Sequence, residues 1–210
     1  MERASGVLAA VCRVHQLIPD RGPVGVTAID KRHVDGPVKV GPLGVYADVQ
    51  ASREHHGGED QAVYAYSEEE ARRWGEELGR RVEPGLFGEN LRVDGIATSD
   101  AVIGQRWRIG ADVVLEVTLP RTPCSTFARR LDEPQWVARF TERADVGCYL
   151  RVVRKGAVKA GDPIVVEHTP AHGITVRDVF RRLAPEQADA LREGHDAGAW
   201  TLPEKILRLL

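Results

Sequence analysis

Residues 113–124 read VVLEVTLPRTPC, an apolar run that ends in a loop containing two prolines. The run from Val113 to Leu119 is short and rich in β-branched residues, which is typical of a buried strand. Pro120 and Pro123 fix the course of the loop, because each proline ring locks its own φ angle. The segment therefore predicts a core strand that leads directly into a rigid loop carrying Cys124.

The same pattern of short apolar runs between Gly and Pro turns continues on both sides of this segment. Further strands are expected at Val7–Val14, Val24–Ile29, Val45–Gln50, Ala62–Tyr66, Leu86–Val93, Val102–Ile109, Tyr149–Val153 and Pro163–Glu167. Many short strands with few helices predict a mainly β fold, closed or strongly curved into a barrel.

A few helices are expected to interrupt the barrel. Ser67 and Glu70 have the spacing of a capping box, and Trp74 lies on the apolar face of the helix that would follow. A second helix is expected over Pro134–Ala144, with Pro134 in its first turn. A helix-like stretch also follows Cys124.

The sequence pattern changes from strand-like to helical at about residue 172. Thr175 and Asp178 have the spacing of a helix start, and later proline and glycine residues divide the remainder into short helical pieces. The sequence therefore predicts a barrel domain over residues 1–170 and a small α-helical domain of three helices over 171–210. Whether this tail forms a homodimer is left open.

The composition is that of a soluble globular protein. The chain has 210 residues, of which 42% are hydrophobic and 29% charged, and its formal net charge is -2. This balance gives no global attraction to nucleic acid or to an anionic membrane, so neither is expected as a partner. The first residues lack a signal-peptide pattern and no apolar run is long enough to span a membrane, so a cytoplasmic location is expected.

Three widely spaced cysteines form no C-x-x-C pair, which favours a reducing compartment and disfavours a zinc knuckle. Arg121 and the start of the following helix both place positive charge near Cys124, which favours the thiolate form that binds metals and acts as a nucleophile. The alternative is a buried small residue. Cys12 and Cys148 lie within apolar runs and are expected in the core.

Three other positions combine polar groups with turns. His56-Gly57-Gly58 with Asp60 could turn backbone N–H groups toward an anion, or could form an ordinary tight turn. Asn90, after the strand break at Gly88, could bind a heterocycle or hydrogen-bond a loop. Lys31 follows a predicted strand and could hold a phosphate or be solvated. Walker, G-x-G-x-x-G, H-E-x-x-H and G-x-S-x-G motifs are absent.

Taken in order, these segments resemble the MOSC domain, the module named for the C-terminal part of molybdenum cofactor sulfurase. The resemblance covers residues 7–168, and the helical tail resembles an extension found on one bacterial branch of the family. The matching pieces are Thr27-Ala28-Ile29-x-Lys31, Gly44-Val45 with Asp48 and Gln50-Ala51, His56-Gly57-Gly58-x-Asp60-Gln61-Ala62-Val63, Phe87-Gly88-Glu89-Asn90-Leu91, Gly104 with Trp107 and Gly110, and Pro120-Arg121-x-Pro123-Cys124.

The resemblance implies a β-barrel that carries the molybdenum cofactor, a molybdenum-binding pterin dithiolene with a terminal phosphate. It implies that Cys124 is both the catalytic residue and the protein ligand to molybdenum. The residues that it implies for binding pterin and phosphate are Lys31, His56, Gly57, Gly58, Asp60, Ser67, Asn90 and Arg121. Two departures are Ser125-Thr126, where the family often has an aromatic and a basic residue, and Gln105, where it is usually acidic.

The leading functional hypothesis from this resemblance is an oxidoreductase that reduces N-hydroxylated small molecules. No cluster, haem or flavin signature is visible, so an external redox protein is expected to donate the electrons. Two alternatives stay open: a non-catalytic carrier of the cofactor or of persulfide sulfur, and a silent barrel used for protein association.

Overall fold

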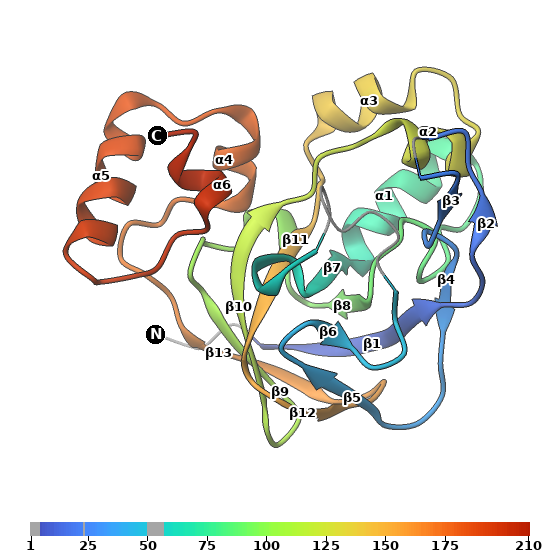
Figure 1. Ribbon diagram of the computed structural model, residues 1–210, viewed down its shortest axis with the longest axis horizontal. Coiled ribbons are helices and arrows are strands. Elements are labelled where there is room, and N and C mark those ends of the chain that lie inside the picture. Colours follow the sequence, from blue (N-terminus) through green and yellow to red (C-terminus); the bar gives the residue numbers. More distant parts are fainter. Residues whose placement is uncertain (1–4, 23, 50–56) are drawn as a thin grey trace.

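The computed structural model describes residues 5–22, 24–49 and 57–210 (Figure 1). Its main sheet contains β1 (Ser5–Val14), β4 (Lys31–His33), β7 (Val63–Ser67), β8 (Leu91–Asp94), β9 (Arg106–Ile109), β10 (Val113–Pro120), β11 (Cys148–Arg154) and β13 (Pro163–His168). The strand order is β13-β9-β10-β11-β7-β8-β1, and β13 also pairs with β1, which closes a barrel of these strands. The barrel predicted from the sequence is confirmed, and β4 extends it outside the ring.

Two smaller sheets flank the barrel. β5 (Val38–Gly41) pairs with β6 (Gly44–Val45) and with β12 (Gly156–Val158), while β2 (Ile18–Pro19) and β3 (Val26–Thr27) form a hairpin. Several expected strands are shorter than the apolar runs suggested. The run Leu86–Val93 becomes a strand only at Leu91, because Gly88 has a φ of 80° and its N–H bonds to the carbonyl of Gly85 in a turn.

The helices are α1 (Glu68–Leu78), α2 (Ser125–Leu131), α3 (Trp136–Arg143), α4 (Val176–Arg181), α5 (Pro185–Asp196) and α6 (Glu204–Leu207). The hydroxyl of Ser67 accepts the N–H of Glu70 at 3.5 Å, as expected of an N-cap. The predicted capping box is nevertheless wrong, because the carboxylate of Glu70 accepts hydrogen bonds from Thr98 and Ser99 instead. Pro134 lies outside α3, which begins only after Gln135.

An aromatic cluster holds α1, α2 and α3 against one end of the barrel. Trp74 of α1, Phe127 of α2, and Trp136 and Phe140 of α3 are all buried around Phe87. Neighbouring ring centroids lie 4.7 to 6.0 Å apart. Because Phe127 lies in the first turn of α2, this packing also fixes the loop that precedes the helix.

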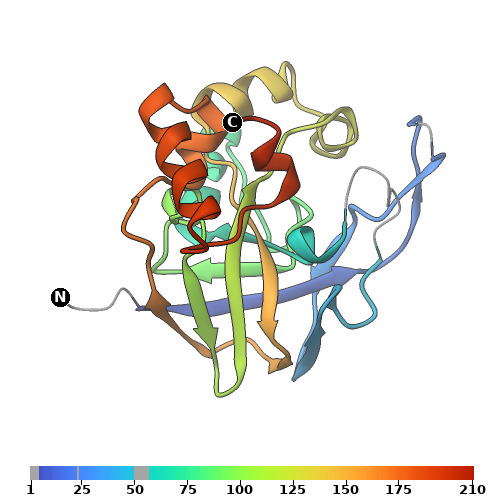
Figure 2. The same ribbon diagram turned by 60° about the vertical axis from the view of Figure 1, so that its left-hand side comes forward.

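The three helices of the tail lie beside β10 and β11 (Figures 1 and 2). Thr175 forms an isolated bridge with Val102, and Thr175 and Asp178 form the predicted capping box at the start of α4. Arg177 then bonds to Asp100 and to Asp145 of the barrel side. Apolar residues of all three helices belong to the same buried cluster as the barrel core. The tail is therefore packed firmly against the barrel.

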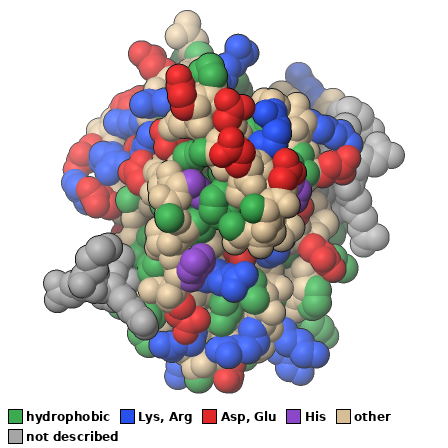
Figure 3. Space-filling view, turned by 90° about the vertical axis from the view of Figure 1, so that its left-hand side faces the viewer, with side chains coloured by type: hydrophobic (Ala, Val, Ile, Leu, Met, Phe, Trp, Pro, Cys, Tyr) green, Lys and Arg blue, Asp and Glu red, His purple; other side chains and the backbone are tan. Residues whose placement is uncertain are grey.

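Charged side chains of both signs are interspersed over the face that carries the tail (Figure 3). This agrees with the nearly balanced count of 29 basic and 31 acidic residues. Among the described residues, no helix has the length and apolar character needed to cross a membrane.

Candidate functional site

Cys124 ends the loop after β10 and is the N-cap residue of α2. Its side chain is half-buried, whereas Cys12 and Cys148 are completely buried, as the sequence predicted for the latter two. Burial raises the pKa of Cys12 to about 12 and also raises that of Cys148. Cys124 is therefore the thiol that solvent, a metal or a ligand can reach.

Two ion pairs fix α2 to the N-terminal part of the chain. Asp20, beside the β2–β3 hairpin, accepts hydrogen bonds from Arg129 at 2.7 and 2.8 Å and from Thr126 at 3.1 Å. Asp30 pairs with Arg130 at 2.7 Å. Burial alone would raise the pKa of Asp30, but the arginine charges beside it outweigh that effect and lower it. These contacts hold the helix that begins at Cys124.

The hydrogen bonds between Arg129 and Asp20 should make the free energy of unfolding depend on pH in the acid range. The hydrogen bond from Arg129 lowers the pKa of Asp20 from 3.8 to about 2. A carboxylate with a lowered folded-state pKa stabilises the fold above its unfolded-state pKa and loses that effect as the pH falls through the folded-state value. Asp20→Asn should therefore be less stable than wild type at about pH 7, and the difference should shrink between about pH 4 and pH 2.

Urea unfolding of wild type and Asp20→Asn across this pH range measures the effect. Asp35→Asn is the matched control, because Asp35 is an exposed aspartate in the loop after β4. A stability difference for Asp20→Asn that stays constant down to about pH 2 would contradict the assignment.

Arg121 lies three residues before Cys124 and is almost fully buried, with 7% of its surface exposed. Its guanidinium lies 3.6 Å from the ring centroid of Phe127 and 5.7 Å from that of Tyr64. Within the described part of the chain, its buried Nη1 has no hydrogen-bond partner. A buried cationic donor without a partner is costly, and a phosphate or another anion would satisfy it.

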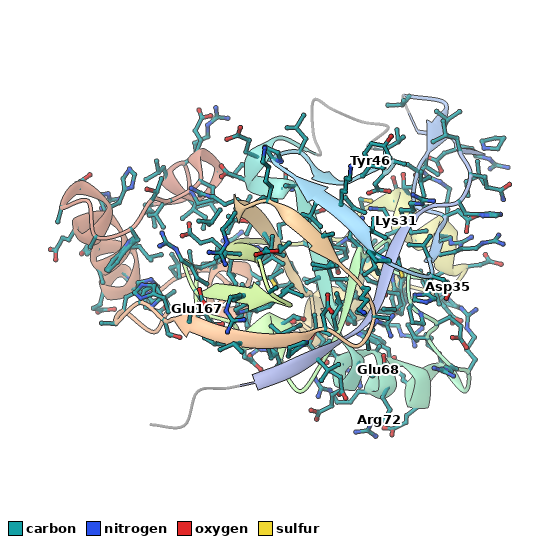
Figure 4. All side chains as sticks on the ribbon, turned by 90° about the horizontal axis from the view of Figure 1, so that it is seen from below. Lys31, Asp35, Tyr46, Glu68, Arg72 and Glu167 are labelled. Carbon is teal, nitrogen blue, oxygen red and sulfur yellow. The ribbon has the colours of Figure 1, made fainter. Side chains whose placement is uncertain are left out.

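A second polar group centres on Asp48. Its carboxylate accepts hydrogen bonds from Lys31 Nζ at 2.6 Å, Asn90 Nδ2 at 2.8 Å and the N–H of Val14 at 2.8 Å. Lys31 begins β4 rather than a loop, and its side chain is nearly buried instead of solvated. In Figure 4, Lys31 and Tyr46 lie toward one end of the molecule, away from Glu167 near the tail.

Tyr64 of β7 connects the two groups. Its backbone N–H donates to the amide oxygen of Asn90 at 3.2 Å, and its ring faces the guanidinium of Arg121. The amide of Asn90 also donates to the carbonyl of Cys12 at 3.2 Å, so its hydrogen-bonding groups are already engaged. Tyr64 thus contacts both Arg121 and Asn90, and Asp48 joins Asn90 to Lys31, while Cys124 lies three residues after Arg121 in the same loop.

The remaining predicted site residues lie at the two opposite ends of β7 or outside the described residues. Gly57 and Gly58 have φ angles of 123° and 82° in the turn before β7, and the carboxylate of Asp60 pairs with Arg151 at 3.0 Å. Ser67 lies at the other end of β7, where its side chain caps α1. His56 lies outside the described residues.

Two residues of this region were not singled out as site residues from the sequence. Asp48 joins Lys31 to Asn90, and Tyr149 of β11 lies with its ring centroid 5.2 Å from that of Tyr64. Burial raises the pKa of Tyr149, the charge of Arg121 opposes the shift, and the charge of Cys124 adds to it. The resemblance included Asp48, but no local pattern marks either residue as a site residue.

Residues 52–165 match the family model described as the MOSC domain. The chain is 32% identical over 181 residues to the uncharacterized protein YflK of Bacillus subtilis, covering 86% of this chain and 77% of that protein. It is 33% identical over 160 residues to a protein named reductase from Gibberella moniliformis, covering 74% of this chain and 28% of that protein. It is 32% identical to protein YiiM of Escherichia coli, covering 71% of this chain and 66% of that protein.

Solved structures show the same fold. The crystal structure of YiiM from Geobacillus stearothermophilus superimposes with a TM-score of 0.76 at 23% identity, covering 97% of this chain and 96% of that one. YiiM from Escherichia coli gives a TM-score of 0.69 at 22% identity, covering 99% and 90%. The family model spans more than half of the chain and YflK matches across most of both sequences. The chain belongs to the MOSC domain family.

Proposed function

We propose that this protein binds the molybdenum cofactor and reduces the N–O bond of N-hydroxylated compounds. The observation that carries the proposal is the half-buried thiol of Cys124 beside Arg121, whose buried Nη1 lacks a partner in the described structure. A thiolate is a good molybdenum ligand, and the unsatisfied guanidinium is a ready donor to the phosphate or pterin of the cofactor. The residues present therefore fit the group.

Each residue has a distinct part in this proposal. Cys124 would hold the metal through its sulfur, and Arg121 would bind an anionic or carbonyl oxygen of the cofactor. Lys31 would offer the remaining N–H donors of its ammonium, which its ion pair with Asp48 holds in place, and Asn90 donates to the same carboxylate. When bound, the cofactor supplies two-electron oxygen-atom transfer.

The overall reaction converts an N-hydroxylated compound, two electrons and two protons to the N–H product and water. We propose that a separate redox protein supplies the electrons. The Gibberella relative named reductase supports an oxidoreductase role, although the chain spans only 28% of that protein.

The test uses protein purified from a host that makes the cofactor. With a reduced viologen dye and an N-hydroxylated purine, we expect dye oxidation matched mole for mole by the N–H product, measured by chromatography. Protein from a cofactor-deficient host is the control and should show no oxidation. Metal-replete protein that oxidises no dye would contradict the reductase proposal.

A carrier function remains the second candidate, because the accessible thiol of Cys124 also suits a persulfide. Intact-protein mass spectrometry of wild type and Cys124→Ser after exposure to a low-molecular-weight persulfide tests it, because a persulfide passes its outer sulfur to a thiolate and leaves as a thiol. A carrier should gain one sulfur atom at Cys124, and protein that stays unmodified at this residue would count against that function.

A further inference from the structure

Five arginines gather around α2 and the β2–β3 hairpin. Arg32 and Arg130 both bond to the carboxylate of Asp30, at 3.2 and 2.7 Å. Arg13 lies directly opposite Arg32 in the pairing of β1 with β4. We call these arginines the basic surface, and its members are Arg13, Arg21, Arg32, Arg129 and Arg130.

The β2–β3 hairpin completes this surface. Arg129 of α2 pairs with Asp20 at 2.7 Å, and the exposed Arg21 follows Asp20 in sequence. β2 and β3 lie beside α2 in Figure 1, and the hairpin stands out from the body of the molecule in Figure 2. Shared carboxylates, strand pairing and sequence neighbours therefore connect all five arginines into one region.

The basic surface keeps an excess of positive charge. In the described part of the chain its ion pairs involve only Asp20 and Asp30, so five arginines against two carboxylates leave a local charge of +3. The whole chain, in contrast, has a formal charge of -2. Like charges directly opposite each other on neighbouring strands repel, so the pairing of Arg13 with Arg32 disfavours folding. Such a local cost is typical of a functional surface, here one that meets negative charge.

Exposed aliphatic side chains accompany the arginines. Leu17, which directly precedes β2, is 52% exposed, while Val24 and Val26 of the hairpin are 49% and 40% exposed. An apolar patch with a charged rim is typical of a protein–protein interface. Single-stranded nucleic acid is bound instead by stacking on aromatic rings, and residues 17–27 contain no aromatic residue. The surface therefore suits an acidic protein.

The basic surface adjoins the proposed metal ligand. Cys124 is the N-cap residue of α2, so Arg129 and Arg130 lie about 7–9 Å further along the same helix axis. Thr126 of the first turn donates a hydrogen bond to Asp20 of the hairpin at 3.1 Å. A protein bound across α2 and the hairpin would thus lie within two helical turns of the thiol.

We propose that the basic surface, together with Leu17, Val24 and Val26, is the docking site of the electron donor, a small acidic redox protein. The inference rests on the reductase function proposed above and names the chemistry of its partner. Complementary charge would steer and orient the donor, and the aliphatic side chains would contact it once docked. A one-electron donor would dock twice, becoming oxidised each time, to supply the two electrons that reduce one N–O bond. Transient electron-transfer complexes bury less than about 1,200 Å², which a hairpin and one helix face can provide.

Binding of oxidised electron carriers tests this surface without turnover. The probes are a plant-type [2Fe–2S] ferredoxin and a flavodoxin, both acidic, and the Kd for the cofactor-loaded protein is measured by isothermal titration calorimetry at low salt. The double variant Arg13→Glu/Arg21→Glu should raise the Kd by at least about tenfold, because two attractive charges become repulsive. Arg21→Glu alone should raise it by about threefold, so the result does not depend on a substitution within β1.

Arg181→Glu/Arg182→Glu is the matched control. Arg181 and Arg182 are exposed arginines at the end of α4 in the tail, and their substitution changes the net charge by the same amount. The Kd of this control should equal that of wild type. Added salt should weaken binding by wild type and by the control, and should weaken binding by Arg13→Glu/Arg21→Glu much less.

Two kinds of result would overturn the proposal. One is an equal Kd in wild type and Arg13→Glu/Arg21→Glu, or no binding of either carrier by wild type. The other is tighter binding of a single-stranded uridine dodecamer than of either carrier, lost in the same double variant, because the surface would then be a nucleic-acid site.

Turnover separates this proposal from the reductase function. With reduced ferredoxin as donor, kcat/KM for ferredoxin should fall at least about tenfold in Arg13→Glu/Arg21→Glu, while the rate with a reduced viologen dye stays at the wild-type value. If wild type oxidises neither donor, the reductase function fails, while carrier binding that depends on Arg13 and Arg21 would still support the docking surface. If wild type oxidises both donors and the double variant behaves identically, the reductase function stands and the docking surface is wrong.

Discussion

The Cys124→Ser variant should lose N–O reductase activity by at least about 100-fold, because loss of a metal ligand costs at least as much as loss of its supporting residues. Serine replaces the thiolate with a neutral hydroxyl, a poor ligand for molybdenum. The fold should not suffer, since Cys124 is half-buried and its backbone carbonyl, rather than its sulfur, accepts the N–H of Ala128 in α2. Serine is also a favourable N-cap residue.

Ser125→Ala is the matched control for this variant. Ser125 is the exposed neighbour of Cys124 at the start of the same helix, so its substitution tests for nonspecific effects on α2. Its activity should stay close to that of wild type. Turnover of Cys124→Ser at the wild-type rate, measured with the same reduced dye and N-hydroxylated purine, would contradict the role of the thiol.

Loss of the buried ion pair between Arg92 and Glu89 should greatly lower the free energy of unfolding. Arg92 and Glu89 are both completely buried, and the guanidinium of Arg92 donates to this carboxylate through Nε at 3.0 Å and also through Nη2. Glu89 accepts the N–H groups of Gly85 and Phe87 as well. Arg92→Met should lower the free energy of unfolding by about 3–5 kcal/mol, because it leaves a buried carboxylate without its cation.

Urea denaturation of the variant and wild type measures this loss. Arg208→Met is the matched control, because Arg208 pairs with Glu204 at 2.5 Å and both side chains are exposed, by 73% and 75%. An exposed pair of this kind contributes at most about 1 kcal/mol. Equal losses in the two variants would show that burial of the Arg92–Glu89 pair does not have the assigned effect.

The barrel could be predicted from the sequence because its strands are continuous apolar runs of strand length. The run at Val113–Leu119 appears in the structure almost unchanged as β10. Pairings between distant segments could not be predicted in the same way. Val38 of β5 pairs with Val158 of β12, although most of the barrel strands lie between them in sequence. Neither β5 nor β12 was expected. The break at Gly88 was expected, but the late start of the strand at Leu91 was not.

The candidate site was predictable to the extent that its chemistry is local. Arg121, Cys124 and the start of α2 are adjacent in sequence, so their proximity follows from the loop itself. The contacts of Lys31 with Asp48 and of Lys205 with Gln61 depend on tertiary packing. Lys205 and its partner Gln61 are 144 residues apart, and no local pattern connects them.

Molybdenum content per chain tests the central claim most directly. Wild type and Cys124→Ser would be purified in parallel from a host that makes the cofactor, and both would be analysed for metal by mass spectrometry. We expect about one molybdenum atom per chain in wild type and less than about a tenth of that in the variant. Equal molybdenum in the two proteins, or none in wild type, would contradict the assignment of Cys124 as the metal ligand.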